Sequence, residues 1–290
     1  MSRAAGRVAI TITLIAWAGF ALSARLIAFS SLSSLEVAVL RYVTAVILLM
    51  PWWRSAWREI RTQRPFKMIL MAVCSGLPFQ LLTALGAGHS SATHVSIINA
   101  GAAPVLVALM MLVTRRRRPA PRAAVALALI ALGIAILALG TPGGGLGILA
   151  LLGSATLWAA YTIAQGEARL SAPTLILLSA APSAVVALAL AAPQLPHLVA
   201  APPHELAFFI ATQGIGSAIV SVACYGIAVR TLGVGTSALA GASTPIIVAI
   251  LSALFLRDHL SAVAWIGLVL VVLGMLLSVG RPARRIVEDG

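Results

Sequence analysis

Charged residues are scarce in this sequence. Only 9% of the 290 residues are charged, whereas 61% are hydrophobic, and the mean hydropathy is +1.05. A typical soluble domain has about 25% charged residues, because its surface has to face water. The composition therefore excludes a sizeable soluble domain and indicates a chain that is surrounded mainly by lipid.

Cysteine is nearly absent, and motifs for metals or nucleotides are missing. Cys74 and Cys224 lie in apolar stretches, where cysteine usually packs as a small hydrophobic residue. His89 and His94 have no acid between them, and the glycines from 143 to 145 are not followed by the Lys and Ser or Thr of a phosphate-binding loop. We therefore expect no disulfide, no metal, no cofactor and no enzyme.

Long apolar runs recur along the whole chain. A bilayer core roughly 30 Å thick needs about 20 apolar residues in a helix, and the runs lack the alternation of barrel strands. The stretch from 66 to 113 is interrupted only by residues 86–91 and can be divided differently. We expect an all-α membrane protein with ten spans, at residues 8–29, 35–53, 66–87, 91–113, 123–140, 145–165, 173–192, 205–229, 234–256 and 260–280.

Basic residues outnumber acidic ones, and their positions follow the expected spans. The net charge is +13, and the run Arg115 to Arg118 alone would suit a nucleic acid. With ten spans, however, nearly all Lys and Arg fall on one side of the membrane. Arg25 and Arg41 lie within spans, and Arg257 lies in a connection on the other side. Because cytoplasmic loops are enriched in Lys and Arg, we expect an inner membrane protein with both termini in the cytoplasm and no nucleic acid partner.

The sequence repeats itself at an offset of 141 residues. The offset matches tryptophan, serine and proline residues, namely Trp17 with Trp158, Ser96 with Ser237, and Pro104 with Pro245. It divides the chain into two five-helix repeats, residues 1–143 and 144–290. Because five is an odd number, the second repeat enters the membrane in the opposite orientation. Inverted repeats of this kind support alternating access in transporters.

The closing part of the sequence resembles a known family. It contains Ser243-Thr244-Pro245, an acid thirteen positions later at Asp258, and then Gly267 and Leu273-Gly274. With these residues, essentially the whole chain resembles the EamA branch of the drug/metabolite transporter superfamily, which implies ten helices in two inverted repeats.

Two features refine the resemblance. Arg41 of the second span agrees with the family, whereas Asp258 stands where the family often has Glu, and its counterpart in the first half is Arg117. No role is therefore carried over to this acid. The length and the stretch from Trp158 to Tyr161 are most similar to exporters of aromatic amino acids and paraquat.

The resemblance implies a central substrate cavity. It would be lined by the third, fourth, sixth, eighth and ninth helices, with the first close by. The polar and aromatic residues at middle depth in these spans are the expected binding residues: Trp17, Gln80, Thr83, Asn99, Trp158, Tyr161, Tyr225, Ser243 and Thr244. Gln80 and Asn99 either bind substrate or tie helices together, since both are costly in hydrocarbon without a partner. By contrast, Trp52 lies beside arginines and is expected to anchor the chain at the membrane interface.

Small residues precede a proline at matching places in the two repeats. They give the expected hinges, Gly101 with Pro104 and Gly241 with Pro245. Small side chains let helices approach closely, and proline removes a backbone donor and permits a kink. Static packing is the alternative explanation for the same residues.

The sequence predicts no charged residue at mid-membrane. A carrier coupled to protons commonly keeps an acid or histidine there, so we expect uncoupled export or exchange of a neutral or zwitterionic substrate. The expected protein is a monomeric exporter of aromatic or neutral amino acids, with a small-molecule substrate and the lipid bilayer as its partners. Efflux of amphipathic cationic drugs is the alternative, and an intramembrane enzyme is a distant third.

Overall fold

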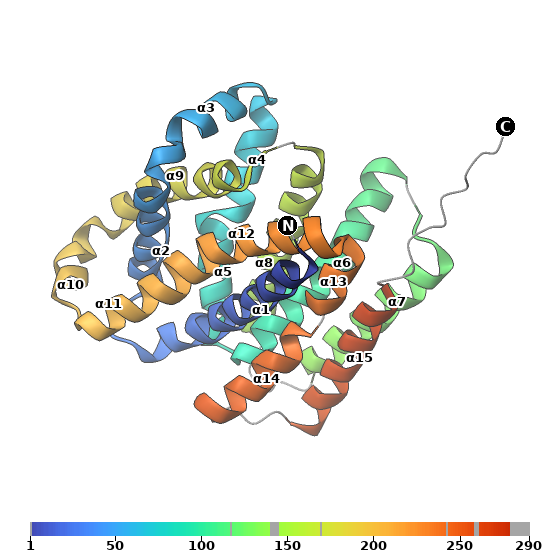
Figure 1. Ribbon diagram of the computed structural model, residues 1–290. Coiled ribbons are helices and arrows are strands. Elements are labelled where there is room, and N and C mark those ends of the chain that lie inside the picture. The colour runs from blue at the N-terminus through green and yellow to red at the C-terminus, as the bar shows by residue number, and fades with distance from the viewer. Residues whose placement is uncertain are drawn as a thin grey trace.

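The protein is almost entirely helical in the computed structural model, which describes residues 2–116, 118–139, 145–168, 170–241, 243–257 and 261–278 (Figure 1). No β-strand occurs in these ranges. The first half of the chain contributes α1 (Arg3–Leu26), η1 (Ile27–Phe29), α2 (Ser34–Leu49), η2 (Met50–Trp52), α3 (Trp53–Arg61), α4 (Pro65–Ser75), α5 (Leu77–Gly88), α6 (Ala92–Arg115) and α7 (Pro121–Leu139). The second half contributes α8 (Gly145–Glu167), α9 (Ala172–Ala191), η3 (Ala192–Gln194), α10 (Leu195–Ala200), α11 (Pro203–Phe209), η4 (Ile210–Val220), α12 (Ser221–Leu232), α13 (Val234–Gly241), α14 (Thr244–Phe255) and α15 (Ala262–Ser278).

Serine side chains set the starts of several helices. At the start of α2, the Ser33 hydroxyl accepts a hydrogen bond from the Glu36 N–H, and the Glu36 carboxylate accepts one from the Ser33 N–H. Ser91 caps α6 in the same way by accepting from the His94 N–H. These contacts satisfy backbone donors that a helix leaves unpaired at its first turn. The apolar runs therefore become helical directly after these serines.

Eight stretches are long and apolar enough to cross a membrane. They are Arg3–Phe29, Ser34–Arg61, Pro65–Gly88, Ala92–Arg115, Pro121–Ala138, Gly145–Glu167, Ala172–Ala200 and Pro203–Leu232. Two shorter apolar helices, Thr244–Phe255 and Ala262–Ser278, follow. The multi-pass helical class and the first eight expected spans agree with this structure. The ninth expected span is divided into α13 and α14, so the count of ten spans stays a prediction.

Two of the long stretches are irregular inside the bundle. The third is divided at Gly76, between α4 and α5, because Pro78 cannot donate a backbone hydrogen bond and the Leu77 N–H instead donates to the Ser183 hydroxyl at 2.9 Å. In the eighth, η4 is an eleven-residue π-helix. Single π-helical turns inside α-helices are frequently found at functional sites. Both irregularities were absent from the sequence expectation, which treated each run as one regular helix.

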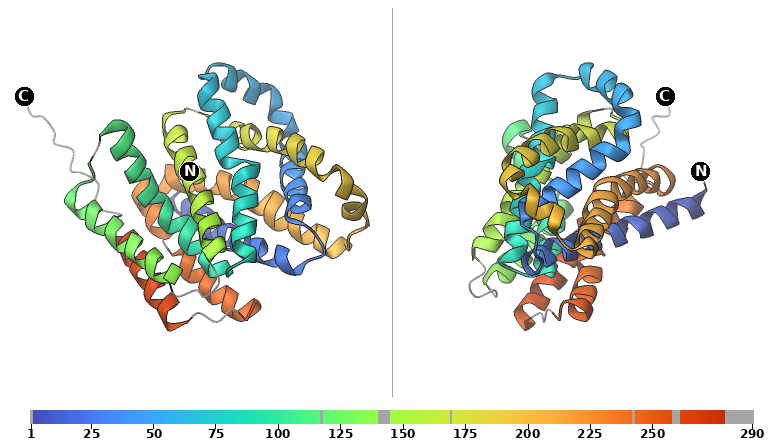
Figure 2. Two further views of the ribbon diagram at one scale, coloured as in Figure 1. Left: turned by 180° about the vertical axis from the view of Figure 1, so that it is seen from behind. Right: turned by 90° about the vertical axis from the view of Figure 1, so that its left-hand side faces the viewer.

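The two halves of the chain are interleaved. Helix α1 packs along α12, α2 along α9, α6 along α8 and α7 along α15, so each of these pairs joins one helix of the first half to one of the second. Both views in Figure 2 show helices of the second half, coloured yellow-green to red, lying among the blue and green helices of the first. The expected repeats therefore fold together as one bundle.

Glycines allow α7 and α15 to approach closely. A Cβ added to Gly133 would lie 2.7 Å from the Gly267 carbonyl oxygen, and one added to Gly274 would lie 2.7 Å from the Ala126 carbonyl oxygen. Close approach through small residues is a usual way for membrane helices to associate. The offset of 141 residues exchanges Gly133 with Gly274 and Ala126 with Gly267. The two contacts are thus equivalent under the repeat.

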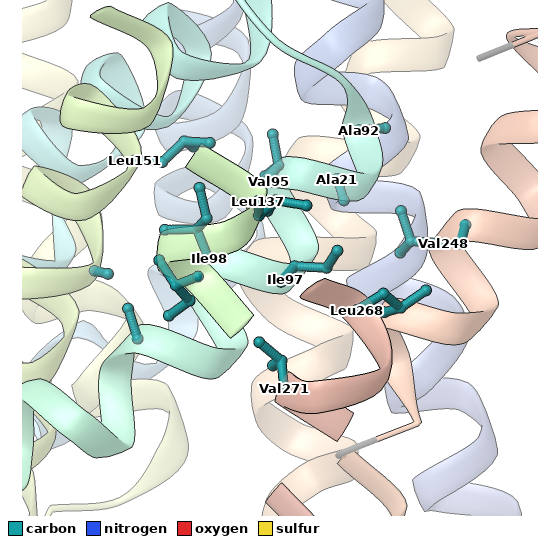
Figure 3. Packing of buried hydrophobic residues seen from close by; sticks show 14 of the residues in the cluster. Ala21, Ala92, Val95, Ile97, Ile98, Leu137, Leu151, Val248, Leu268 and Val271 are labelled. Atoms are coloured by element: carbon teal, nitrogen blue, oxygen red, sulfur yellow. The ribbon is translucent and has the colours of Figure 1, made fainter. Parts of the chain in front are cut away.

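One large apolar cluster lies where α1, α5, α6, α7, α8, α14 and α15 meet (Figure 3). It includes Ala21 of α1, Val95 of α6 and Val248 of α14, which are all buried. These small and branched side chains bring α1 and α14 against the first turns of α6. The cluster closes the bundle beside the cavity described next.

Candidate functional site

A cavity of about 580 Å³ lies in the middle of the bundle. Its walls come from α1, α2, α4, α5, α6, α8, α9, η4, α12, α13 and α14. At one end it reaches Gln165 near the end of α8, Ala172 at the start of α9 and Arg230 near the end of α12. We call this end of the bundle, where α3 also lies, the basic end, because Lys67 and Arg115 lie there too. The other end, with the ends of α1, α5 and α9, is called the opposite end.

A row of aromatic rings follows one wall of the cavity. The ring centroids of Phe79 and Trp158 are 5.4 Å apart, and those of Trp158 and Tyr161 are 5.1 Å apart. Phe20 continues the row, 6.2 Å from Phe79. Trp158 lies in the middle of α8 and is nevertheless 37% exposed, because its side chain faces the cavity. The row offers apolar ring faces to a ligand.

A second aromatic pair lines the cavity from other helices. Trp17 of α1 and Tyr225 of α12 have ring centroids 5.2 Å apart. Gly241 of α13 lies against this pair, since a Cβ added there would be 3.3 Å from the Trp17 ring. Trp17 and Trp158, which the repeat offset matches, therefore line one cavity.

Arg41 places a positive charge in the cavity wall. It lies in the middle of α2, is only 8% exposed, and lines the cavity. Its guanidinium donates to the Gln213 side-chain carbonyl at 2.8 Å and to the Ser217 hydroxyl at 3.0 Å. The expectation that no charge lies at mid-depth is therefore wrong. In the sequence, this residue could be recognised as an arginine inside an apolar run. Its partners could not be recognised, because they lie more than 170 residues away.

The family is shown by comparison with known proteins. A model described as the EamA-like transporter family matches residues 5–139 and, separately, residues 145–280. The chain belongs to this family. A solved structure described as "Crystal structure of protein" aligns over 96% of this chain and 98% of that chain, with a TM-score of 0.61 and 16% sequence identity, and so shares the fold. No curated protein matches the chain.

Six of the nine expected binding residues of this EamA-like transporter line the cavity. They are Trp17, Asn99, Trp158, Tyr161, Tyr225 and Thr244. Asn99 accepts a hydrogen bond from the Ser154 hydroxyl at 2.8 Å, and Thr244 is buried at the start of α14. Whether these residues bind substrate stays a prediction.

The other three expected residues lie away from the cavity wall. Gln80 and Thr83 are fully buried on α5, and the Gln80 amide donates to Gln213 at 3.4 Å. Ser243 donates to the Ala240 carbonyl oxygen at 2.6 Å in the connection between α13 and α14. None of the three is among the described residues that line the cavity. For Gln80 the structure shows the helix-tying contact that the sequence left as an alternative to binding.

The expected hinges differ from one another in their surroundings. Helix α6 runs through Pro104 without a break, and a Cβ on Gly101 would lie 2.7 Å from the Val271 side chain of α15. In the second half, Pro245 stands in the first turn of α14, directly after the described end of α13 at Gly241. Asp258 and Arg117, which the family comparison singled out, lie outside the described residues.

Polar contacts join different helices at the two ends of the transporter. At the basic end, Glu167 of α8 pairs with Lys67 of α4 at 3.0 Å and with Arg115 of α6. At the opposite end, the Arg25 guanidinium of α1 donates to the carbonyl oxygens of Ala87 and Gly88 at the end of α5, at 3.1 and 3.0 Å. Arg25 therefore connects α1 and α5, two of the helices that line the cavity.

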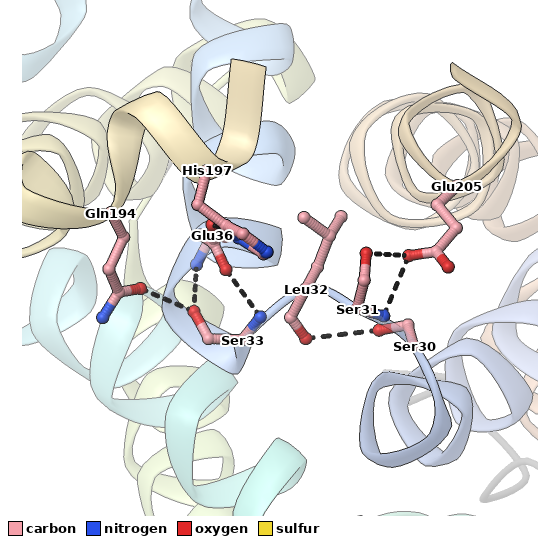
Figure 4. Close-up of polar contacts among 8 residues, drawn as sticks. All are labelled: Ser30, Ser31, Leu32, Ser33, Glu36, Gln194, His197 and Glu205. Carbon is pink, nitrogen blue, oxygen red and sulfur yellow. Dashed lines mark hydrogen bonds and ion pairs between the residues drawn. The ribbon is translucent and has the colours of Figure 1, made fainter. Parts of the chain in front are cut away.

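Figure 4 shows a further polar cluster at the opposite end. The Ser31 hydroxyl and N–H both donate to the Glu205 carboxylate, at 2.8 and 3.1 Å. The Ser33 hydroxyl donates to the Gln194 side chain at 2.7 Å, and His197 Nδ1 lies 2.7 Å from Glu36 Oε1. These contacts tie the connection between α1 and α2 to the segment that follows α9.

Proposed function

We propose that this EamA-like transporter exports amino acids, especially aromatic and neutral ones, across the inner membrane by alternating access. It would act as a monomer, with both termini in the cytoplasm. The observation that carries the proposal is a central cavity walled by aromatic rings and by no carboxylate among the described residues. Its volume of about 580 Å³ is within the range of roughly 300–1,000 Å³ that is usual for small-molecule sites.

The aromatic walls favour a substrate with a flat apolar part. Trp158 sits between Phe79 and Tyr161 and still exposes part of its ring to the cavity. A ring that stacks on such a face gains about 0.5–1.5 kcal/mol beyond the burial of its area. Aromatic amino acids have both such a ring and the polar groups that Asn99 and Thr244 can bind.

The charges around the cavity decide between amino acids and cationic drugs. Arg41 and Arg230 line the cavity, and its described lining residues include neither Asp nor Glu. A bare cation would meet repulsion there without a compensating partner. This arrangement favours a zwitterionic substrate over an amphipathic cationic drug such as paraquat.

The position of the cavity supports export. It reaches the basic end, which is the cytoplasmic end if Lys and Arg follow their usual distribution. The substrate of an exporter enters from that side. The Gly133 and Gly274 contacts are equivalent under the repeat, which supports two halves related by a twofold axis. If the two halves exchanged their conformations, the cavity would open to the other side of the membrane.

A flux assay in proteoliposomes tests the proposal. Labelled phenylalanine, tryptophan and leucine are compared with a cationic dye, each with and without a proton gradient. We expect amino-acid flux without any gradient and no flux of the dye. Dye transport without amino-acid transport would favour the drug-efflux alternative, and strict dependence on the gradient would contradict the uncoupled mechanism.

A further inference from the structure

Arg41 is a buried cation with no carboxylate beside it. It is 8% exposed in the middle of a membrane helix, and none of the ion pairs among the described residues involves it. An unpaired charge at this depth is costly, so intramembrane arginines usually pair with an acid or mark a substrate path. The structure supplies only neutral partners within the described chain, and the charge itself stays uncompensated.

The neutral partners fix the position of the guanidinium. The Gln213 side-chain carbonyl accepts from Arg41 at 2.8 Å, while the Gln213 amide donates to the Ser23 hydroxyl at 2.8 Å. Ser217, one turn further along η4, accepts from the same Arg41 nitrogen. The guanidinium also lies over the Phe20 ring, 5.1 Å from its centroid. Arg41 is thus held in one place before any ligand arrives, as a preorganised site requires.

Several donors in residues that line the cavity make no hydrogen bond within the described residues. Arg41 Nε is buried and has no hydrogen-bond partner within the described residues, and the same holds for the Asn99 amide nitrogen and the Ser96 and Thr244 hydroxyls. All four residues line the cavity. Each of these groups can donate a hydrogen bond, and each belongs to a residue that lines the same cavity as Arg41. Donors beside a positive charge suit a carboxylate, which accepts at two oxygens.

We infer that Arg41 binds the carboxylate of the transported substrate, and that the substrate class is an apolar or aromatic molecule carrying a carboxylate, whether or not it also carries an amine. The inference rests on the proposed function in that it concerns the same cavity. It goes further by making the carboxylate the required group and the amine dispensable. The rings from Phe20 to Tyr161 then receive the apolar part of the substrate.

A series of phenylalanine derivatives tests this on the wild-type protein. Calorimetric titration of the purified transporter measures the Kd of phenylalanine, of 3-phenylpropionate, which lacks the amine, and of phenylalaninamide, which lacks the carboxylate. We expect the two acids to bind with similar Kd and the amide to bind at least about tenfold more weakly, since charge-assisted pairs are the strong ones. Equal binding of acid and amide would overturn the inference without any variant.

Variants assign the effect to Arg41. In Arg41→Gln, the ratio of the Kd of the amide to the Kd of the acid should fall to about threefold or less. Arg41→Lys should keep part of this ratio, because lysine keeps the positive charge but lacks the parallel N–H donors of the guanidinium. Arg230, exposed at the basic end, is the other cation among the described residues that line the cavity, and Arg230→Gln tests it in the same way. Arg7→Gln is the control, since Arg7 is exposed on α1 and is not among the described residues that line the cavity. It should keep the full ratio. Loss of the ratio in Arg230→Gln, with Arg41→Gln unchanged, would move the carboxylate site to the cavity mouth and overturn the assignment.

The outcomes also separate this inference from the proposed function. If 3-phenylpropionate binds in an Arg41-dependent way while no amino acid is transported, the inference holds and the amino-acid proposal fails. If amino acids are transported and the amide binds as well as the acid, the transport proposal holds and the carboxylate site at Arg41 is wrong.

Discussion

The two ends of the helix bundle differ in which helices are joined by polar contacts. At the opposite end, α1 is joined to its neighbours, because Arg25 of α1 binds the last carbonyl groups of α5 and small apolar side chains of α1 pack with α6 and α14. At the basic end, the ion pairs of Glu167 join α4, α6 and α8 and do not involve α1. The cavity reaches the basic end, where none of the described ion pairs joins α4, α6 or α8 to α1, α9 or α12.

The helix pair α2 and α9 is held by similar contacts at both ends of the bundle. The Ser33 hydroxyl at the start of α2 donates to Gln194, just after α9, and the Ser171 N–H at the start of α9 donates to Glu59 in α3, just after α2, at 2.8 Å. Helices α2 and α9 are therefore clasped at both of their ends. We expect this pair to stay fixed while α1 and α5, which Arg25 connects, separate at the opposite end during transport.

The largest effect should come from locking the opposite end. A Cβ added to Gly88 would lie 4.0 Å from the Ala28 Cβ, which suits a disulfide. The double substitution Ala28→Cys and Gly88→Cys, with Cys74 and Cys224 replaced by serine, should lose nearly all transport on oxidation and regain it on reduction. Ala28→Cys alone, oxidised in the same way, is the control. Undiminished flux with a complete disulfide would mean that this end does not open.

Removing the central ring should have the next largest effect. Trp158→Ala deletes contacts with Phe79 and Tyr161 as well as the surface offered to substrate, and we expect flux to fall about tenfold, equivalent to about 1.4 kcal/mol. Trp52→Ala should transport at the wild-type rate, because Trp52 is 47% exposed on η2 away from the cavity. Initial rates at equal reconstituted protein measure both. Greater damage from Trp52→Ala would mean that the cavity is misassigned.

Weakening the closure should have a moderate effect. Arg25→Gln removes the charge from two hydrogen bonds to the end of α5, and bonds to charged groups contribute roughly 1.5–3 kcal/mol when buried, less at this half-exposed site. We expect a cysteine at Ala21, which is buried in the wild type, to react several times faster with a membrane-impermeant reagent added at the opposite side. An unchanged reaction rate would show that Arg25 does not hold this end closed.

The smallest effect is expected for the ion pair at the basic end. Lys67 pairs with Glu167, whose side chain is 44% exposed, and exposed pairs contribute about 0–1 kcal/mol. Lys67→Gln should change the midpoint of thermal unfolding only slightly and leave flux within about twofold of wild type. A loss of flux comparable with that of Trp158→Ala would show that the basic end also takes part in closure.

Much of the helical architecture was accessible from the sequence, because the length of an apolar run decides whether it can span a bilayer. The break at Gly76 was missed because Gly-Leu-Pro stands inside such a run, although Pro78 was its visible cause. Trp17 and Trp158, which were selected by their depth and their match under the repeat, line the cavity, and their binding of substrate stays a prediction. It was harder to predict which neighbour a buried polar side chain contacts. Gln80 turns toward Gln213, a contact set by packing between distant helices.

The most direct test of the account asks whether substrate occupies the cavity from the basic end. Thr162 is exposed and lines the cavity, so Thr162→Cys, in a background without the native cysteines, reports on it. The side of the reagent is fixed by labelling Thr62→Cys, at the end of α3. We predict that an impermeant reagent modifies Thr162→Cys from the same side as Thr62→Cys, and that phenylalanine slows the reaction in proportion to its occupancy. Modification only from the other side, or a rate unaffected by phenylalanine, would contradict the account.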